Sequence, residues 1–150
     1  MVDAQQRRAV AATVGAGVAI VGTFLPWLRS GARDRSSYTI FDLVERLGFA
    51  PGGALSWSLR LWPIVPMLLV LDVVAVWLVI ATGKGHRSLV LSTGVIALWV
   101  AGTAVAVRFA PDAGLFRAGV GPLVTVGGVV CLVAGVALIS SRGSDASATS

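Results

Sequence analysis

The chain has 150 residues, of which 56% are hydrophobic and 13% charged, and its mean hydropathy is +0.87. An average soluble domain is about 45–50% apolar and about 25% charged, so the composition indicates a membrane protein. The net charge of +5 does not require nucleic acid as a partner. Most of the Lys and Arg residues fall between or beside apolar segments, where they suit the flanks of a lipid bilayer.

Four apolar segments, 9–28, 61–82, 88–109 and 121–140, have the length that a helix needs to cross about 30 Å of hydrocarbon. The first is too long for a signal-peptide core and no A-x-A site follows it, so we expect it to be retained. The predicted fold class is an all-α membrane protein. We expect one domain, 1–140, built as a four-transmembrane-helix bundle, and a disordered polar tail, 141–150.

The Lys and Arg residues do not decide the topology by number. With both termini inside, five of them (Arg7, Arg8, Lys84, Arg87, Arg142) face the cytoplasm and seven (Arg29, Arg33, Arg35, Arg46, Arg60, Arg108, Arg117) face outside. That count opposes the positive-inside rule. By density, however, the short turn 83–87 and the N-terminal tail are the more basic segments. We therefore expect cytoplasmic termini, an extracytoplasmic loop at 29–60 and a plasma-membrane location.

Asp72 lies near the middle of the second segment, which has no other charge well inside its ends. A carboxylate at that depth costs roughly 2.5–3.5 kcal/mol on insertion scales, so it raises a functional question. Because the connection 83–88 is short, helices two and three form a hairpin, and symmetric pairing places Trp99 opposite Asp72. We predict that the Trp99 indole donates to Asp72; Thr93 and Thr103 lie at less suitable depths.

Two interpretations of Asp72 compete. It is either a polar clasp between helices, or a proton or cation site in a transport path. No second acid, Lys or His accompanies it inside a segment, and relays usually need more than one such group, so we favour the clasp. Small residues indicate where helices approach closely. The stripes are Ala11, Gly15, Ala19 and Thr23; Gly94, Ala97, Ala101 and Ala104; and Gly127, Cys131 and Gly135.

The long loop contains a predicted amphipathic helix at 40–47. Thr39 and Asp42 fit a capping pattern, and Gly48 is a natural stop. We expect this helix to lie on the membrane surface or to cap the bundle. Four side chains of the loop are candidate contacts to an anionic headgroup or partner: Arg29, Arg33, Arg35 and Tyr38.

Residues with recognisable chemistry are scarce. His86 is the only histidine and has no metal-binding partner nearby in sequence, and Cys131 is the only cysteine, so no intrachain disulfide is possible. No phosphate-binding glycine loop occurs. We predict no catalytic, cofactor-binding or metal residues and no cofactor.

Two motifs resemble those of small four-span membrane proteins of actinobacteria, a largely uncharacterised group. They are Gly22-Thr-Phe-Leu-Pro-Trp-Leu-Arg-Ser-Gly31, and Arg35-Ser-Ser-Tyr-Thr-Ile-Phe-Asp-Leu43 followed by Arg46-Leu-Gly48. The resemblance covers about residues 22–53 and the four-span layout. It implies a plasma-membrane location and an outward-facing first loop, and it implies no activity.

The sequence therefore leads to a first hypothesis of a non-enzymatic accessory or scaffold subunit that binds a membrane or envelope partner, or a second copy. The alternative is a small proton- or ion-coupled transporter or channel oligomer that uses Asp72. A weaker third option is a lipid-modifying enzyme with its site among the loop arginines.

Overall fold

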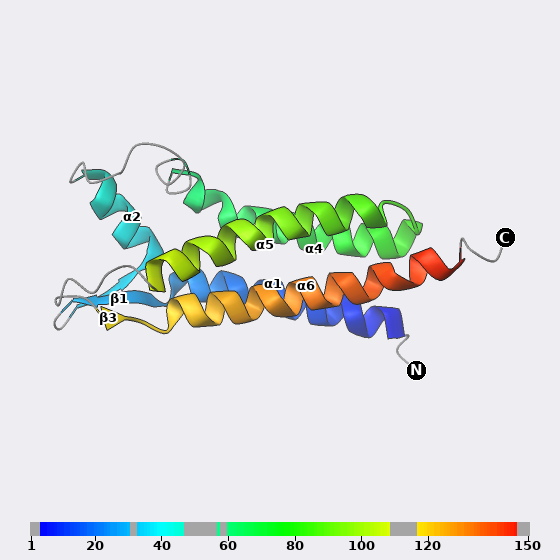
Figure 1. The fold of residues 1–150 in the computed structure, drawn as a ribbon, viewed down its shortest axis with the longest axis horizontal. Coiled ribbons are helices and arrows are strands. Elements are labelled where there is room, and N and C mark those ends of the chain that lie inside the picture. Colours follow the sequence, from blue (N-terminus) through cyan, green and yellow to red (C-terminus); the bar gives the residue numbers. More distant parts are fainter. Residues whose placement is uncertain (1–3, 31–32, 47–56, 58–59, 109–116, 147–150) are drawn as a thin grey trace.

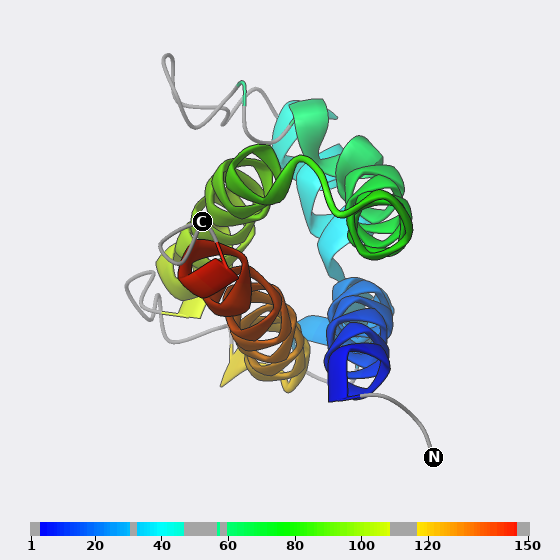
Figure 2. The ribbon, with the colours of Figure 1, turned by 90° about the vertical axis from the view of Figure 1, so that its right-hand side faces the viewer.

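The structure is a computed structural model that describes residues 4–30, 33–46, 57, 60–108 and 117–146. The chain is mostly helical, which supports the predicted all-α class. Four long helices lie side by side along the molecule (Figure 1): α1 Ala4–Phe24, α4 Val65–Thr82, α5 His86–Arg108 and α6 Gly121–Ala146. Viewed from the end they form a ring in the order α1, α4, α5, α6 (Figure 2).

Three helical segments within the described residues are long and apolar enough to cross a membrane: Trp62–Thr82, His86–Ala106 and Gly121–Ser140. They coincide with the predicted segments 61–82, 88–109 and 121–140 to within three residues. α1 has 21 residues but does not belong to this set. Its two arginines and its many Gly, Ala and Thr residues make it less apolar than the other three.

The predicted C-terminal boundary of the first segment, 9–28, is wrong. α1 stops at Phe24, and Pro26–Ser30 is strand β1. Pro26 explains the stop, because proline has no amide hydrogen for the helical ladder and disfavours helical geometry in the residue before it. The predicted disordered tail also needs correction, since α6 continues to Ala146. Residues 147–150 lie outside the described residues.

Prolines and glycines set the ends of α4. A short 3-10 turn, η1 Trp62–Ile64, precedes the helix, and Pro63 and Pro66 lie in first turns, where proline removes no helical hydrogen bond. At the other end Gly83 adopts a left-handed conformation with φ 67°, and its amide donates to the Val79 carbonyl at 2.8 Å. The turn that follows leads directly into α5.

The sequence did not indicate a sheet, and one forms at the start of the predicted loop 29–60. Strands β1 Pro26–Ser30, β2 Arg33–Ser36 and β3 Arg117–Ala118 form an antiparallel sheet in the order β2-β1-β3. Helix α2, Ser37–Arg46, follows β2 directly. It contains residues 40–46 of the predicted amphipathic helix 40–47 but begins three residues earlier, so Thr39 lies inside it and is not its cap. Residue 47 lies outside the described residues.

The tightest packing in the molecule is between α1 and α6, where glycines bring the two backbones together. A Cβ atom built on Gly15 would lie 2.5 Å from the Leu132 amide nitrogen and 2.8 Å from the Gly128 carbonyl oxygen. The corresponding distances to backbone nitrogens of the facing helix are 2.5 Å for Gly22, 2.3 Å for Gly128 and 2.9 Å for Gly135. Close backbone approach of this kind, between helices that present small residues to each other, is typical of helix pairs in membranes.

The predicted small-residue stripes are confirmed in part. In α1, Gly15, Ala19 and Thr23 are buried, whereas Ala11 is exposed. In α6 only Gly135 is buried; Gly127 and Cys131 are exposed. The residues of α6 that face α1 come one position later in the sequence than those predicted. One position along a helix corresponds to a rotation of about 100°. In α5, Ala97 and Ala104 are buried, and Gly94 is exposed.

Candidate functional site

Asp72 lies on the buried face of α4, together with Val65, Leu69, Val76 and Val79. The spacing of three and four residues places all five on one side of the helix. Asp72 is 4% exposed, so the carboxyl group is enclosed by protein and needs polar partners there.

Those partners are two hydroxyl groups of α5, across the α4–α5 hairpin. The Thr93 hydroxyl donates to Oδ2 of Asp72 at 2.7 Å, and Ser92 Oγ lies 3.3 Å from Oδ1. Thr93 is buried and well placed. Ser92 is exposed, and its single hydrogen is shared with the Leu89 carbonyl at 3.0 Å. Thr93 is therefore the stronger of the two contacts.

The predicted partner of Asp72 was Trp99, and this prediction is wrong. Asp72 accepts from residues six and seven positions earlier in α5. The turn consists of residues 83–85 rather than 83–88, which moves the level opposite Asp72 from residue 99 to residue 96. Thr93 lies three residues before residue 96, which is less than one helical turn. Ser92-Thr93, adjacent hydroxyls in an otherwise apolar segment, were the signal in the sequence.

Trp99 belongs instead to an aromatic cluster at the end of the molecule that carries the sheet. Trp62 is its centre: ring centroids lie 5.1 Å from Phe41, 5.2 Å from Trp27 and 6.3 Å from Trp99. Interplanar angles of 76–81° make these edge-to-face contacts, which are favourable between aromatic rings. The four rings come from β1, α2, η1 and α5, so the cluster joins the outer elements to the long helices.

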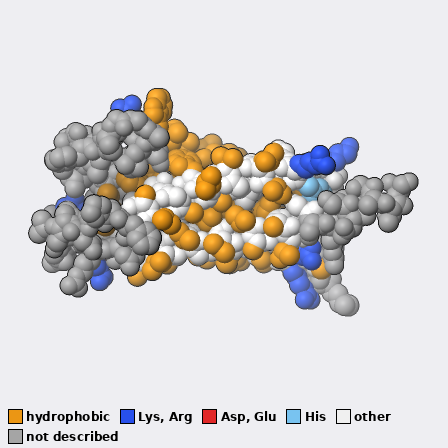
Figure 3. Space-filling model, in the orientation of Figure 1, with side chains coloured by type: hydrophobic (Ala, Val, Ile, Leu, Met, Phe, Trp, Pro, Cys, Tyr) orange, Lys and Arg blue, Asp and Glu red, His pale blue; other side chains and the backbone are white. Residues whose placement is uncertain are grey.

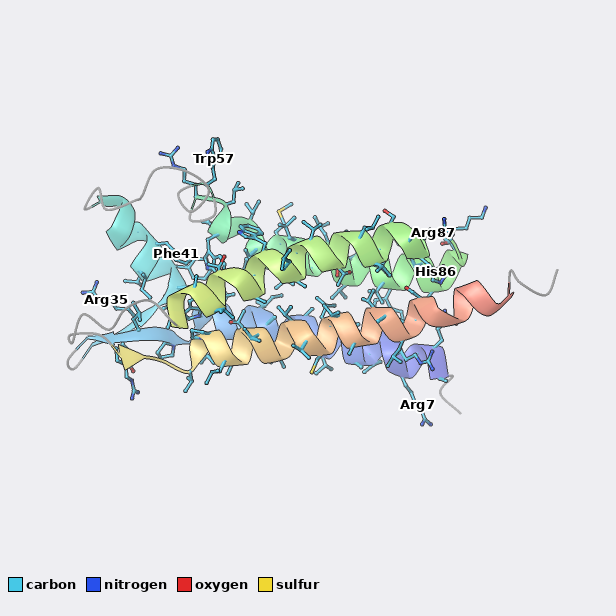
Figure 4. All side chains as sticks on the ribbon, viewed as in Figure 1. Arg7, Arg35, Phe41, Trp57, His86 and Arg87 are labelled. Atoms are coloured by element: carbon cyan, nitrogen blue, oxygen red, sulfur yellow. The ribbon has the colours of Figure 1, made fainter. Side chains whose placement is uncertain are left out.

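Buried hydrogen bonds fix this aromatic cluster. The Trp62 indole donates to Ser37 Oγ at 2.9 Å, and the Ser37 hydroxyl donates to the Thr23 carbonyl at 2.6 Å. The Trp27 indole donates to the Gly22 carbonyl at 2.9 Å. Satisfied indoles explain why Trp27 and Trp62 can be fully buried. Trp57, in contrast, is 65% exposed and lies near the start of α4 (Figure 4).

Two of the four candidate headgroup contacts, Arg29 and Tyr38, have partners within the protein. Arg29 pairs with Asp34, with Nε 2.8 Å from Oδ1, and both side chains are exposed. Arg35 lies on β2 at the sheet end (Figure 4). The Tyr38 ring packs on Phe24 with centroids 5.0 Å apart, and its hydroxyl is 3.3 Å from Thr23 Oγ1. Tyr38 thus belongs to the contact between α2 and α1. The Arg33 side chain lies outside the described residues.

Other polar side chains offer little reactive chemistry. Within the described residues no group of three or more His, Cys, Asp or Glu could hold a metal ion. His86 is in the first turn of α5, and Cys131 is on the exposed face of α6. A further contact between helices, Trp77 Nε1 to Thr13 Oγ1 at 3.2 Å, links α4 to α1.

Comparison with known proteins gives no match: no family model matches the sequence, and neither a curated protein nor a solved structure is similar to it. The resemblance to small actinobacterial membrane proteins therefore stays a prediction.

Proposed function

We propose that this chain is a multi-pass protein of the plasma membrane in which α1 is a fourth spanning helix and both termini are cytoplasmic. The outward face of α1 supports this proposal, because Val10, Val14, Val18 and Val21 are exposed at spacings of three and four residues. A helix with small residues towards its neighbour and valines outward suits a lipid environment. α1 also begins at the end of the molecule where α6 finishes (Figure 1).

Within the membrane, we propose that the protein is a non-enzymatic accessory or scaffold subunit. The observation that carries this proposal is the pairing of Asp72, whose two oxygens accept from Thr93 and Ser92 within the same hairpin. A carboxyl group held in this way serves as a clasp. A proton or cation path would need further ionisable groups along it, and the apolar segments contain none well inside their ends.

The aromatic cluster also favours a scaffold over a conducting path. Four large rings, Trp27, Phe41, Trp62 and Trp99, meet at one end of the ring of helices. Trp27 and Trp62 are fully buried among these rings. The sheet and α2 lie beyond them as a folded unit, which makes this end the surface that we assign to a membrane or envelope partner.

The proposal is tested by affinity purification of the tagged protein from its native membrane in mild detergent. Two charge reversals at opposite ends, Arg35→Glu and Lys84→Glu, are compared with wild type and with Asp72→Asn. We expect a stoichiometric partner that Arg35→Glu loses and that Lys84→Glu and Asp72→Asn retain. The alternative is a proton- or ion-coupled transporter. A homo-oligomer without a partner, whose proton flux in liposomes is abolished by Asp72→Asn, would establish that alternative.

A further inference from the structure

We propose that the end of the molecule opposite the sheet binds the anionic phospholipid headgroups of the cytoplasmic leaflet through a basic collar of Arg7, Lys84 and Arg87. This inference rests on the proposed insertion in the membrane. It assigns the headgroup contact to a different surface from the loop arginines that the sequence indicated.

Lys and Arg outnumber acidic residues around this end. Arg7 and Arg87 lie on opposite sides of the ring of helices (Figure 4), and Lys84 is in the turn before Arg87. All three are exposed. Lys and Arg side chains gather at both edges of this end (Figure 3). Such a spread fits a plane of headgroups better than a single phosphate ion.

Among the side chains that the structure describes, no acidic one balances the collar. The described acidic side chains lie elsewhere: Asp34 and Asp42 near the sheet, and Asp72 inside the hairpin. Over the whole sequence at this end, segments 1–8, 83–87 and 141–150 contain five Lys and Arg against two Asp. Anionic lipids of the cytoplasmic leaflet attract such segments.

The fold holds the collar at a defined level. Arg8, next to Arg7, donates to the Leu138 carbonyl and so ties the start of α1 to α6. Gly83 and Gly85, both with positive φ, shape the tight turn that presents Lys84. The segment Trp62–Thr82 has 21 residues, about 31 Å of helix, which matches the hydrocarbon thickness. With Trp62 at one boundary, Lys84 and Arg87 fall at the other, among the headgroups.

The arginines at the sheet end are less suited to this role. Arg29 is already paired with Asp34, which lowers its attraction for another anion. Arg35 is only half-exposed. The structure therefore separates two basic regions, and in the collar all three cations are exposed and none has an ion pair among the described residues.

The test measures lipid preference directly. The full-length protein is reconstituted in vesicles of equal parts phosphatidylglycerol and phosphatidylcholine, transferred to mild detergent, and the lipids it retains are counted by native mass spectrometry. The variant Arg7→Gln/Lys84→Gln/Arg87→Gln is compared with a matched control, Arg29→Gln/Arg35→Gln/Arg60→Gln. Both remove three positive charges, but from opposite ends.

We expect wild type to retain phosphatidylglycerol in preference to phosphatidylcholine. One Lys or Arg near an anionic surface contributes about fivefold in binding, so the collar variant should lose about a hundredfold of this preference. The loss of lipid preference in the control should be less than a fifth of the loss in the collar variant. Raising the salt concentration should weaken the wild-type preference. Equal retention of both lipids by wild type would overturn the proposal, and so would a larger loss in the control.

Carbonate extraction of the same vesicles keeps this test separate from the proposed membrane insertion. Protein that stays in the membrane but shows no lipid preference refutes the collar alone. Protein released by carbonate refutes the insertion itself.

Discussion

The packing of α1 against α6 makes a sharp prediction for Gly15→Ala. The new Cβ atom would lie 2.5 Å from the Leu132 amide nitrogen, whereas ordinary contact begins at 3.4 Å, so the helices must separate locally by up to about 0.9 Å. All three nearest atoms belong to the backbone of α6, and no side-chain rotation can relieve the overlap. Overpacking of this kind costs about 1–3 kcal/mol.

Gly17→Ala is the matched control, because a Cβ atom on Gly17 has nothing within 4 Å. Both variants gain the same helix propensity, about 1 kcal/mol. The difference between them therefore isolates the interface. We expect Gly15→Ala to be less stable than Gly17→Ala by about 2 kcal/mol, which is roughly thirtyfold in the folding equilibrium.

The assay is unfolding of the purified protein in mild-detergent micelles by titration with sodium dodecyl sulfate, followed by circular dichroism. If Gly15→Ala proves as stable as Gly17→Ala, the close approach of α1 and α6 is refuted. Refutation would also weaken the proposal that α1 is a spanning helix, which rests on its outward valines together with this close packing against α6.

Further variants test three other parts of the structure. Thr93→Val should destabilise the protein by about 1–2 kcal/mol in the same titration. Ser92→Ala should cost less than half of that, since the Ser92 contact to Asp72 is longer and exposed. Equal costs would contradict the two hydrogen-bond lengths to Asp72. Trp62→Phe keeps a ring but removes the indole N–H that anchors α2, so amide exchange in α2 should rise about fivefold, from a loss of about 1 kcal/mol. Gly83→Ala should cost about 1–2 kcal/mol because residue 83 has a left-handed backbone conformation, whereas exposed Gly94 should tolerate alanine. An unchanged unfolding midpoint for Gly83→Ala would argue against the left-handed conformation at the end of α4.

Interactions that are local in sequence were the ones that could be predicted. The three apolar segments gave helices at the expected places, and Gly83 ended α4 as a glycine stop does. The amphipathic pattern at 40–47 gave α2. Even Pro26, which ended α1 earlier than predicted, acted through its own missing amide hydrogen.

The site was predicted only in part, because its contacts depend on the level of one helix against another. Asp72 stood out as a charge in an apolar segment, but its partner depends on where the turn begins and ends. An assumed turn of six residues pointed to Trp99, and the observed turn leads to Thr93 and Ser92. A shift of a few residues along α5 was enough to exchange an indole for two hydroxyls.

By itself, the sequence determined the helical class, the three most apolar segments, the outlying carboxyl group and the basic ends, since each depends on residue type and on spacing along one element. The tertiary structure alone decided the sheet, whose strand β3 is about 90 residues from its partner β1. It also decided which face of α6 packs on α1, and which aromatic rings meet around Trp62. These features depend on how distant elements approach each other, and a periodic pattern in one helix says which residues share a face but not which neighbour that face meets.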